Sequence, residues 1–160
     1  MLRALWLAGV FLIAGCAEVA LESQPPDRFD LAGTWTLVED QSETPPAPRR
    51  LGARGTMLPL ITQDFPVLRA EQLRIEQSAD SIGIYYDGRD YRDVSWGVRQ
   101  RGLWEVRAGW NEGRLLIISN APDADAQETL SLSPDGRTLR VDVDVESRGS
   151  DISLTRVYRR

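Results

Sequence analysis

Short runs of alternating apolar and polar residues fill most of the second half of the chain. Between residues 71 and 158 these runs are separated by Gly, Asp, Asn and Pro, which favour tight turns. A period of two places alternate side chains on opposite faces of a β-strand. The pattern therefore predicts an all-β fold, built from an antiparallel meander with one buried face.

The turn residues divide the chain into about nine predicted strands. Asp87-Gly88 and Pro134-Asp135 mark two of the turns, and residues 120–126 are expected to form a loop. The predicted strands cover residues 31–38, 73–77, 81–86, 91–98, 102–110, 114–119, 129–133, 139–145 and 152–159. This number of strands can close an up-and-down barrel with room for side chains or one small ligand. An open, strongly curved sheet would satisfy the same pattern.

The segment between the first and second predicted strands does not alternate. Three prolines within residues 45–48 exclude a regular strand ladder, so residues 39–54 are expected to form a long surface loop. Residues 50–70 are more apolar, but Pro59 and Pro66 interrupt any long helix. We expect them to fold over the barrel as a cap with at most a short helix.

Length and composition narrow the function further. The chain has 160 residues, enough for one domain with a sizeable core. Its 24 acidic and 19 basic residues give a net charge of −5, and all 19 basic residues are Arg because the sequence contains neither Lys nor His. The absence of imidazole and amine groups excludes a His base, a Schiff-base Lys and a Ser-Lys pair. The acidic balance, without a basic stripe, argues against a nucleic-acid partner.

Carboxylates are the remaining candidates for catalysis or metal binding. Asp87, Asp90 and Asp93 are spaced by three across a predicted turn, and Asp123 and Asp125 lie in a predicted loop. None of them fits the looped calcium site with its central Gly and terminal Glu. The sequence also lacks a Gly-x-Ser-x-Gly elbow, a phosphate-binding loop and a dinucleotide fingerprint. We therefore predict no catalytic residue, no metal site and no cofactor.

The N-terminus has the features of a bacterial signal sequence. Arg3 is followed by the apolar residues 4–14, a run too short to span a bilayer as a permanent helix. It ends in the sequence IAGC at residues 13–16, which resembles a lipobox, and Cys16 is the sole Cys of the chain. An ordinary secretory signal with a chance Cys and a short membrane anchor are the alternatives.

The lipobox resemblance implies a division of the chain. Residues 1–15 are the predicted signal peptide, Cys16 is the predicted lipidation site, and residues 16–30 form a polar, flexible tether. Residues 31–160 are the predicted barrel domain. Acyl chains such as palmitate on Cys16 would anchor the protein stably in a membrane. Because Ala17 rather than Asp follows the Cys, we expect the outer membrane of a Gram-negative envelope, with the domain facing the periplasm.

Two motifs at the ends of the predicted meander resemble the calycin barrels, the lipocalins and the fatty-acid-binding proteins. They are GTW at residues 33–35 and TRVY at residues 155–158. In that superfamily a Trp on the first strand packs under an Arg from near the end of the barrel, so the resemblance implies a contact between Trp35 and Arg156. It also implies that Arg156 and Tyr158 hold a ligand carboxylate inside the barrel.

The residues themselves allow two interpretations of these motifs. Arg156 and Tyr158 are two positions apart and so share one face of a strand. If that face points inward, their donors can bind an acyl carboxylate by charge-assisted hydrogen bonds. Alternatively, the guanidinium of Arg156 lies on the Trp35 indole and fastens the seam of the barrel.

The tryptophans of the central strands also have two interpretations. Trp96, Trp104 and Trp110 either line an apolar pocket or fill the core. Two hypotheses about function follow. The protein is a non-enzymatic binding module for a small apolar or amphipathic ligand, or it is an interaction module with a solid barrel that docks an envelope protein. A cavity of a few hundred cubic ångströms would favour the first, and a barrel filled by Trp and Leu side chains would favour the second.

Overall fold

The computed structural model describes residues 19–27, 29–45, 58–148 and 150–160. The predicted signal peptide and Cys16 lie outside the described residues. The strands are β1 (Gly33–Leu37), β2 (Gln72–Gln77), β3 (Ser81–Tyr86), β4 (Asp90–Ser95), β5 (Gly97–Arg101), β6 (Trp104–Asn111), β7 (Arg114–Ala121), β8 (Ala124–Leu132), β9 (Thr138–Ser147) and β10 (Ser150–Arg159). The helices are η1 (Glu39–Gln41), α1 (Leu58–Asp64) and η2 (Pro66–Leu68).

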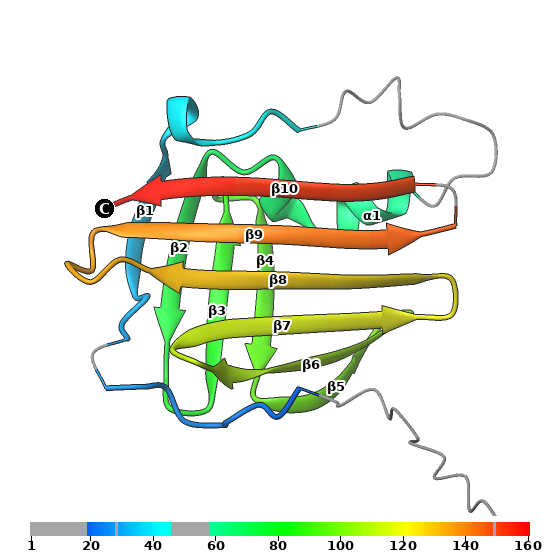
Figure 1. Cartoon of the computed structure of the whole chain (residues 1–160), viewed down its shortest axis with the longest axis horizontal. Helices are drawn as coiled ribbons and strands as arrows, with labels where there is room; N and C mark the ends of the chain where they lie inside the picture. The colour runs from blue at the N-terminus through cyan, green and yellow to red at the C-terminus, as the bar shows by residue number, and fades with distance from the viewer. Residues whose placement is uncertain (1–18, 28, 46–57, 149) are drawn as a thin grey trace, which may run out of the picture.

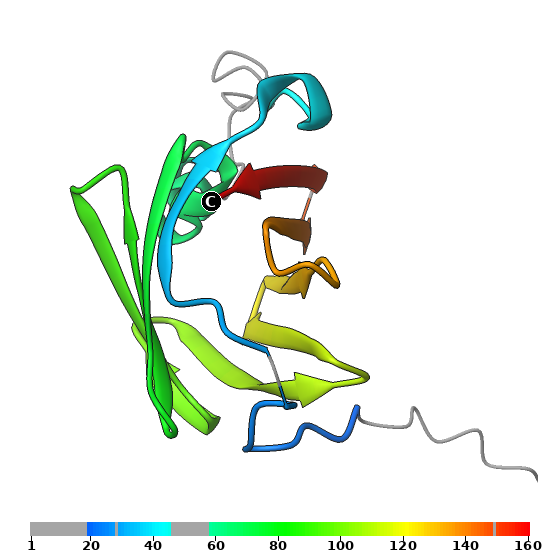
Figure 2. The ribbon, with the colours of Figure 1, turned by 90° about the vertical axis from the view of Figure 1, so that its left-hand side faces the viewer.

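The described strands form one antiparallel sheet that curls into a nearly closed barrel. Their order is β4-β3-β2-β1-β10-β9-β8-β7-β6-β5, so each strand pairs with its neighbour along the chain except at one place. β1 and β10 close the seam, whereas β4 and β5 are the two free edges. Strands β1 to β4 cross strands β6 to β10 at a steep angle (Figure 1), and the two groups face each other as two layers (Figure 2). The predicted all-β, up-and-down architecture is confirmed.

The strand count differs from the prediction by one because a predicted strand is broken. The expected strand at residues 91–98 divides into β4 and β5 at Trp96, whose side chain turns into the core. Gly97 follows with a φ of 86°, which a residue with a side chain rarely adopts. The predicted loop at residues 120–126 is instead a tight turn, and β8 begins as early as Ala124.

Alternation along the strands separates the core from the surface. On β9, Leu139, Val141 and Val143 are buried, whereas Arg140 and Asp144 between and beyond them are exposed. The buried side chains of both layers form one continuous core. This core is the main stabilising element, because burying apolar surface contributes about 25 cal/mol for each Å² removed from water.

The seam between β1 and β10 carries a Trp–Arg contact, but with a different arginine from the one predicted. Trp35 is fully buried, and its indole Nε1 donates to the carbonyl of Leu31 at 2.8 Å. The guanidinium carbon of Arg160, not that of Arg156, lies 4.7 Å from the centre of the Trp35 ring. The reason is the register, in which Thr36 pairs with Arg159, the last residue of β10, so that Arg160 comes next to Trp35.

One end of the barrel is covered by the segment that was predicted to be a flexible tether. The backbone N–H groups of Glu22 and Trp110 each donate to the other residue's carbonyl at 2.8 Å. Phe29 is buried, with its ring 4.6 Å from that of Trp110. Gly109 makes room for this segment, because a Cβ at this position would lie 2.7 Å from the Glu22 carbonyl oxygen. The predicted tether thus contacts the barrel at Glu22 and Phe29.

The other end is covered by the cap between β1 and β2. As predicted, the described part of the cap contains one short α-helix, α1, followed by η2. The ring of Phe65 packs edge-on against Trp104 with ring centres 5.2 Å apart, and the Trp104 indole donates to Asp64 at 2.8 Å. The cap is thus joined to β6 by one aromatic contact and one hydrogen bond.

We predict that Arg160→Ala lowers the free energy of unfolding by about 1 kcal/mol. The variant loses the contact with Trp35 and the hydrogen bonds from Arg160 to the carbonyls of Ala32 and Gly136. Chemical denaturation measures the change. Arg159→Ala is the matched control, because this neighbouring side chain is exposed and surface changes of this kind stay within about 0.5 kcal/mol. Equal effects of the two variants would contradict a role for Arg160 in the seam.

Candidate functional site

Several polar side chains are buried inside an otherwise apolar barrel. Arg92, Glu128 and Arg156 are 2%, 2% and 4% exposed, and Tyr86 and Tyr158 are 2% and 0% exposed. They come from strands on both sides of the barrel. A buried charge is costly unless it is paired and hydrogen-bonded, so these side chains form the candidate functional site.

Arg92 on β4 and Glu128 on β8 form an ion pair across the interior. Nη1 of Arg92 donates to Oε2 of Glu128, and the two side chains are 1% and 2% exposed. The Nε and Nη2 atoms of Arg92 have no hydrogen-bond partner among the described residues. A buried ion pair needs further hydrogen bonds to offset its desolvation. Arg92 therefore retains unused donors that can bind an oxygen atom.

Tyr86 belongs to the same polar group. Burial raises the pKa of its hydroxyl above the usual range, the negative charge of Glu128 adds to the increase, and the positive charge of Arg92 opposes it. The tyrosine consequently stays protonated, which keeps it available as a hydrogen-bond donor next to the ion pair.

Arg156 and Tyr158 both point inward, as predicted, and converge on one oxygen atom. Nη2 of Arg156 donates to the carbonyl oxygen of Ala70 at 2.9 Å, and the Tyr158 hydroxyl donates to the same oxygen at 3.0 Å. Nη1 of Arg156 also reaches the carbonyl of Glu43 at 3.3 Å. The two side chains thus fasten the chain just before β2 to the barrel. Binding of a ligand carboxylate by this pair remains a prediction.

The tryptophans predicted to line a pocket lie at opposite ends of the barrel. Trp96 and Trp110 are adjacent, with ring centres 5.6 Å apart, at the end covered by Phe29. Trp104 lies under the cap against Phe65. All three are buried and belong to the core, together with Trp35. They therefore do not line one common pocket.

The wall of the second layer is built from small side chains near one end. Ser119 pairs with Ala126 across β7 and β8, and Ala124 lies two positions before Ala126 on the same inner face. The cap residues Ile61 and Phe65 are part of the same continuous core. Ser119 Oγ is buried there without a hydrogen-bond partner among the described residues.

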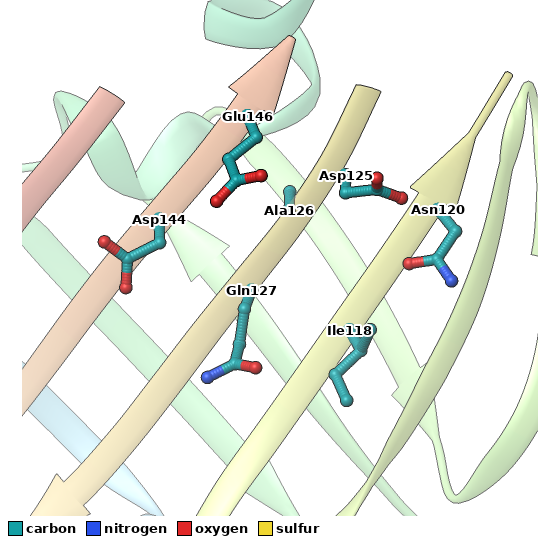
Figure 3. A pocket seen from close by; sticks show the side chains of 7 residues that line it. All are labelled: Ile118, Asn120, Asp125, Ala126, Gln127, Asp144 and Glu146. Carbon is teal, nitrogen blue, oxygen red and sulfur yellow. The ribbon is translucent and has the colours of Figure 1, made fainter. Parts of the chain in front are cut away.

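The depressions formed by the described residues open to solvent. One, of about 300 Å³, lies between α1 and the β5–β6 turn and is lined by Gln63, Asp64, Arg101, Gly102, Leu103 and Trp104. Another, of about 390 Å³, lies over β7, β8 and β9 (Figure 3). There the exposed carboxylates of Asp125 and Glu146 are directly opposite each other across the strands. Asp144 and Glu146 of β9 thus point outward, away from the core.

Two features are absent from the described residues. No group of three or more Asp, Glu or Cys side chains within the described ranges is arranged to hold a metal ion. None of the helices in those ranges has the length and apolar character needed to cross a bilayer.

Comparison with solved structures identifies the fold. A fatty-acid-binding protein of Echinococcus granulosus superposes with a TM-score of 0.55 at 13% identity, over 81% of this chain and 96% of that one. Zebrafish ileal bile acid-binding protein in complex with cholic acid gives 0.51 at 16% identity, over 81% and 97%. A secretory abundant heat soluble protein of Ramazzottius varieornatus gives 0.51 at 17% identity, over 81% and 94%. This chain has a calycin-like fold.

The likeness of the calycin-like barrel to these proteins is one of architecture. No protein-family model matches the sequence, and no curated protein matches it either. The identities are too low to carry individual residue roles from one protein to another.

Sequence reasoning missed the Arg92–Glu128 pair, although the sequence contains a signal for it. Arg92 occupies an inward position between Asp90 and Val94, and Glu128 occupies one between Ala126 and Leu130. A charged residue in the phase of the apolar positions marks a polar core site. The pair joins β4 to β8, and such distant pairing does not follow from alternation.

We predict that stability falls as the pH rises from 10 to 12 and that Tyr158→Phe reduces this slope. Burial raises the pKa of Tyr158 from 10.0 to about 12, so the folded state holds the proton more tightly than the unfolded chain. Stability is therefore complete below pH 10 and declines toward pH 12. One tyrosine contributes up to about 1.4 kcal/mol per pH unit.

Urea denaturation at several pH values measures the slope, and tyrosinate absorbance of the folded protein checks the titration. Because the chain has no Lys, no side-chain amine titrates between pH 10 and 12 and adds to the measured change. An identical slope for wild-type protein and Tyr158→Phe would contradict the prediction.

Proposed function

We propose that the protein is a lipid-anchored protein of the cell envelope whose calycin-like barrel binds a small amphipathic ligand, without catalysis. The observation that carries this proposal is the set of buried polar atoms with unused hydrogen-bonding capacity inside an apolar barrel. They belong to Arg92, Ser119, Trp110 and Arg156. Ligand sites combine a mostly apolar wall with a few polar groups that orient the ligand.

The fold supports the proposal at the level of architecture. Its structural neighbours include a fatty-acid-binding protein and a bile acid-binding protein in complex with cholic acid. Those ligands are amphipathic, with an acidic group on an apolar body. An acyl-type ligand with an acidic head group would match the apolar wall and the buried guanidinium groups of this barrel.

The cap supplies a way to make room for such a ligand. Its contacts with β6 are the packing of Phe65 on Trp104 and the hydrogen bond from Trp104 to Asp64. Phe65 belongs to the same core as the wall of small residues that includes Ala124 and Ala126. Moving Phe65 outward would open apolar space over this wall, as lids do in other binding proteins.

The membrane anchor in this proposal is the lipidated Cys16. The lipobox-like sequence at residues 13–16 and the single Cys support it. Several acyl chains on one residue give stable attachment, whereas a single chain gives marginal binding. Ala17 supports an outer-membrane location with the barrel in the periplasm.

We predict that native mass spectrometry of the mature protein, purified from its own envelope in a neutral detergent, detects an amphipathic ligand of a few hundred daltons. Palmitate added to a delipidated sample should bind at one molecule per chain. Asp64→Asn, which weakens the link between the cap and Trp104, should speed uptake. A clean protein mass, with no palmitate adduct at any concentration below micelle formation, would contradict ligand binding.

We predict that Cys16 carries diacylglycerol and an amide-linked acyl chain and that the protein fractionates with the outer membrane. Peptide mass spectrometry of the N-terminus and density separation of membranes measure the two properties. Cys16→Ala should abolish the modification and leave an uncleaved or soluble form. Cleavage at another position, with an unmodified Cys16, would contradict the anchor while leaving the barrel's ligand binding open.

Protein interaction is the second candidate function. The observation that favours it is the packing of the barrel, which is closed by Phe29 at one end and by the cap at the other. A filled interior that never takes up palmitate would leave the outer surface as the functional part. Cross-linking of the anchored protein in intact cells would then identify an envelope partner.

A further inference from the structure

The barrel is open along one line, between β4 and β5. These two strands follow each other in the chain but do not pair, and they are the free edges of the sheet. The chain leaves β4 at the buried Trp96 and enters β5 at Gly97. Side chains, not backbone hydrogen bonds, must therefore fill the gap.

Arginines line this gap from both sides. Arg92 of β4 is an inward, buried residue. On β5, Arg101 pairs with Trp104 and Arg99 pairs with Val106, and these partners on β6 are buried. Residues directly opposite on paired strands point to the same face. Arg101, which is half-buried, therefore stands on the inner side of β5 next to the gap, whereas Arg99 is exposed to solvent.

Arg101 and Arg92 flank the same aromatic pair, because Arg101 lies opposite Trp104 on β6, Trp104 packs on Phe65, and the Phe65 ring lies 5.6 Å from the Arg92 guanidinium. Partial burial lowers the pKa of Arg101, and the positive charge of Arg92 lowers it further, whereas Asp64 and Glu128 act in the opposite direction. Both of those carboxylates already accept a hydrogen bond, Glu128 from Arg92 and Asp64 from Trp104. Two guanidinium groups brought together in this way attract an anion.

A purely structural ion pair does not explain the arrangement. One arginine suffices to pair with Glu128, and an adjacent Arg101 adds repulsion inside a partly desolvated site. Arg92 nevertheless keeps two nitrogen atoms, Nε and Nη2, whose N–H donors have no partner among the described residues. An oxyanion between Arg92 and Arg101 would satisfy those donors and neutralise the excess positive charge.

We infer that the gap between β4 and β5 is an oxyanion site, in which Arg92 and Arg101 bind the acidic head group of the amphipathic ligand. The inference rests on the proposed ligand-binding function and names the part of the barrel that recognises the ligand. The carboxylate of a free acid and the phosphate of a phospholipid share the required chemistry.

The site is connected to the surface beside the cap. Arg101 lines the depression of about 300 Å³ between α1 and the β5–β6 turn, so an approaching anion meets Arg101 before Arg92. The Phe65 ring of the cap lies 5.6 Å from the Arg92 guanidinium and covers it from that side. When Phe65 moves, the head group reaches Arg92 while the apolar tail enters the space that Phe65 leaves.

The gap is a better oxyanion site than the pair on β10. Arg156 and Tyr158 already donate to the carbonyl oxygens of Ala70 and Glu43, and only Nε of Arg156 has no partner among the described residues. An oxyanion at that position would first have to displace the backbone before β2. At Arg92 only Nη1 is bonded, to Glu128, whereas Nε and Nη2 have no partner among the described residues.

Binding of matched amphiphiles tests the inference. Native mass spectrometry of the mature protein in neutral detergent gives apparent dissociation constants for palmitate, hexadecanol and palmitoyl lysophosphatidic acid. Palmitate should bind at least about tenfold more tightly than hexadecanol, and Arg101→Met should remove roughly tenfold of palmitate affinity while leaving hexadecanol unchanged. Glu128→Gln, which keeps an acceptor for Arg92 but removes the competing charge, should tighten palmitate binding.

Two further variants keep the test decisive. Arg92→Met combined with Glu128→Leu replaces the ion pair by apolar residues, a change that buried pairs tolerate, and should abolish the preference for palmitate over hexadecanol. Arg140→Met is the control, because Arg140 is an exposed arginine on β9 paired with Asp142, and it should bind like wild-type protein. If the double variant fails to fold, Arg101→Met still decides.

The possible outcomes separate this inference from the proposed function. Binding of palmitate and hexadecanol with equal affinity, unaffected by Arg101→Met, would overturn the oxyanion site but retain the ligand-binding barrel. Binding of none of the three amphiphiles would overturn both. Arginine-dependent binding of palmitate alone would identify a free acid, and arginine-dependent binding of the lysophospholipid would identify a phospholipid-derived head group; each supports the site.

Discussion

The structure depends on the hydrogen-bonded seam between β1 and β10. A sheet of antiparallel strands exposes unpaired backbone groups at both edges, and such edges invite aggregation unless they are paired or covered. The seam begins with Thr36 opposite Arg159, and the chain after β1 continues it, since Val38 donates to the Val157 carbonyl at 2.8 Å. Closing the barrel here moves the unpaired edges to β4 and β5, where side chains must replace the missing ladder.

The need for side chains at these two edges explains why charged residues, Arg92 and Glu128, are buried in this part of the barrel. Replacing a buried ion pair by apolar residues of similar volume is often neutral or stabilising. The fold therefore does not need Arg92 and Glu128 for its stability. Their position next to the gap, and the second arginine at residue 101, are more easily understood as requirements of recognition than as requirements of folding.

The sequence predicts the architecture well because period-two alternation directly reports which face of a strand is buried. It predicts the contacts at the β1–β10 seam and those of the N-terminal segment less well. The register that brings Arg160 rather than Arg156 to Trp35 depends on a shift of four residues, which short motifs do not determine. The segment after Val19 has no apolar period, so its pairing with Trp110 is invisible until the barrel exists. The Arg92–Glu128 pair is likewise a product of closure, since it joins residues 36 positions apart.

The backbone pairing of Glu22 with Trp110 has a consequence for where the protein can work. Val19, the first described residue, comes three positions after Cys16, and three residues of extended chain reach roughly 11 Å. If Cys16 is the anchor, the barrel stays close to the bilayer surface and cannot carry a ligand across the periplasm. Its cargo would be exchanged with the leaflet beneath it or with proteins that come to that leaflet.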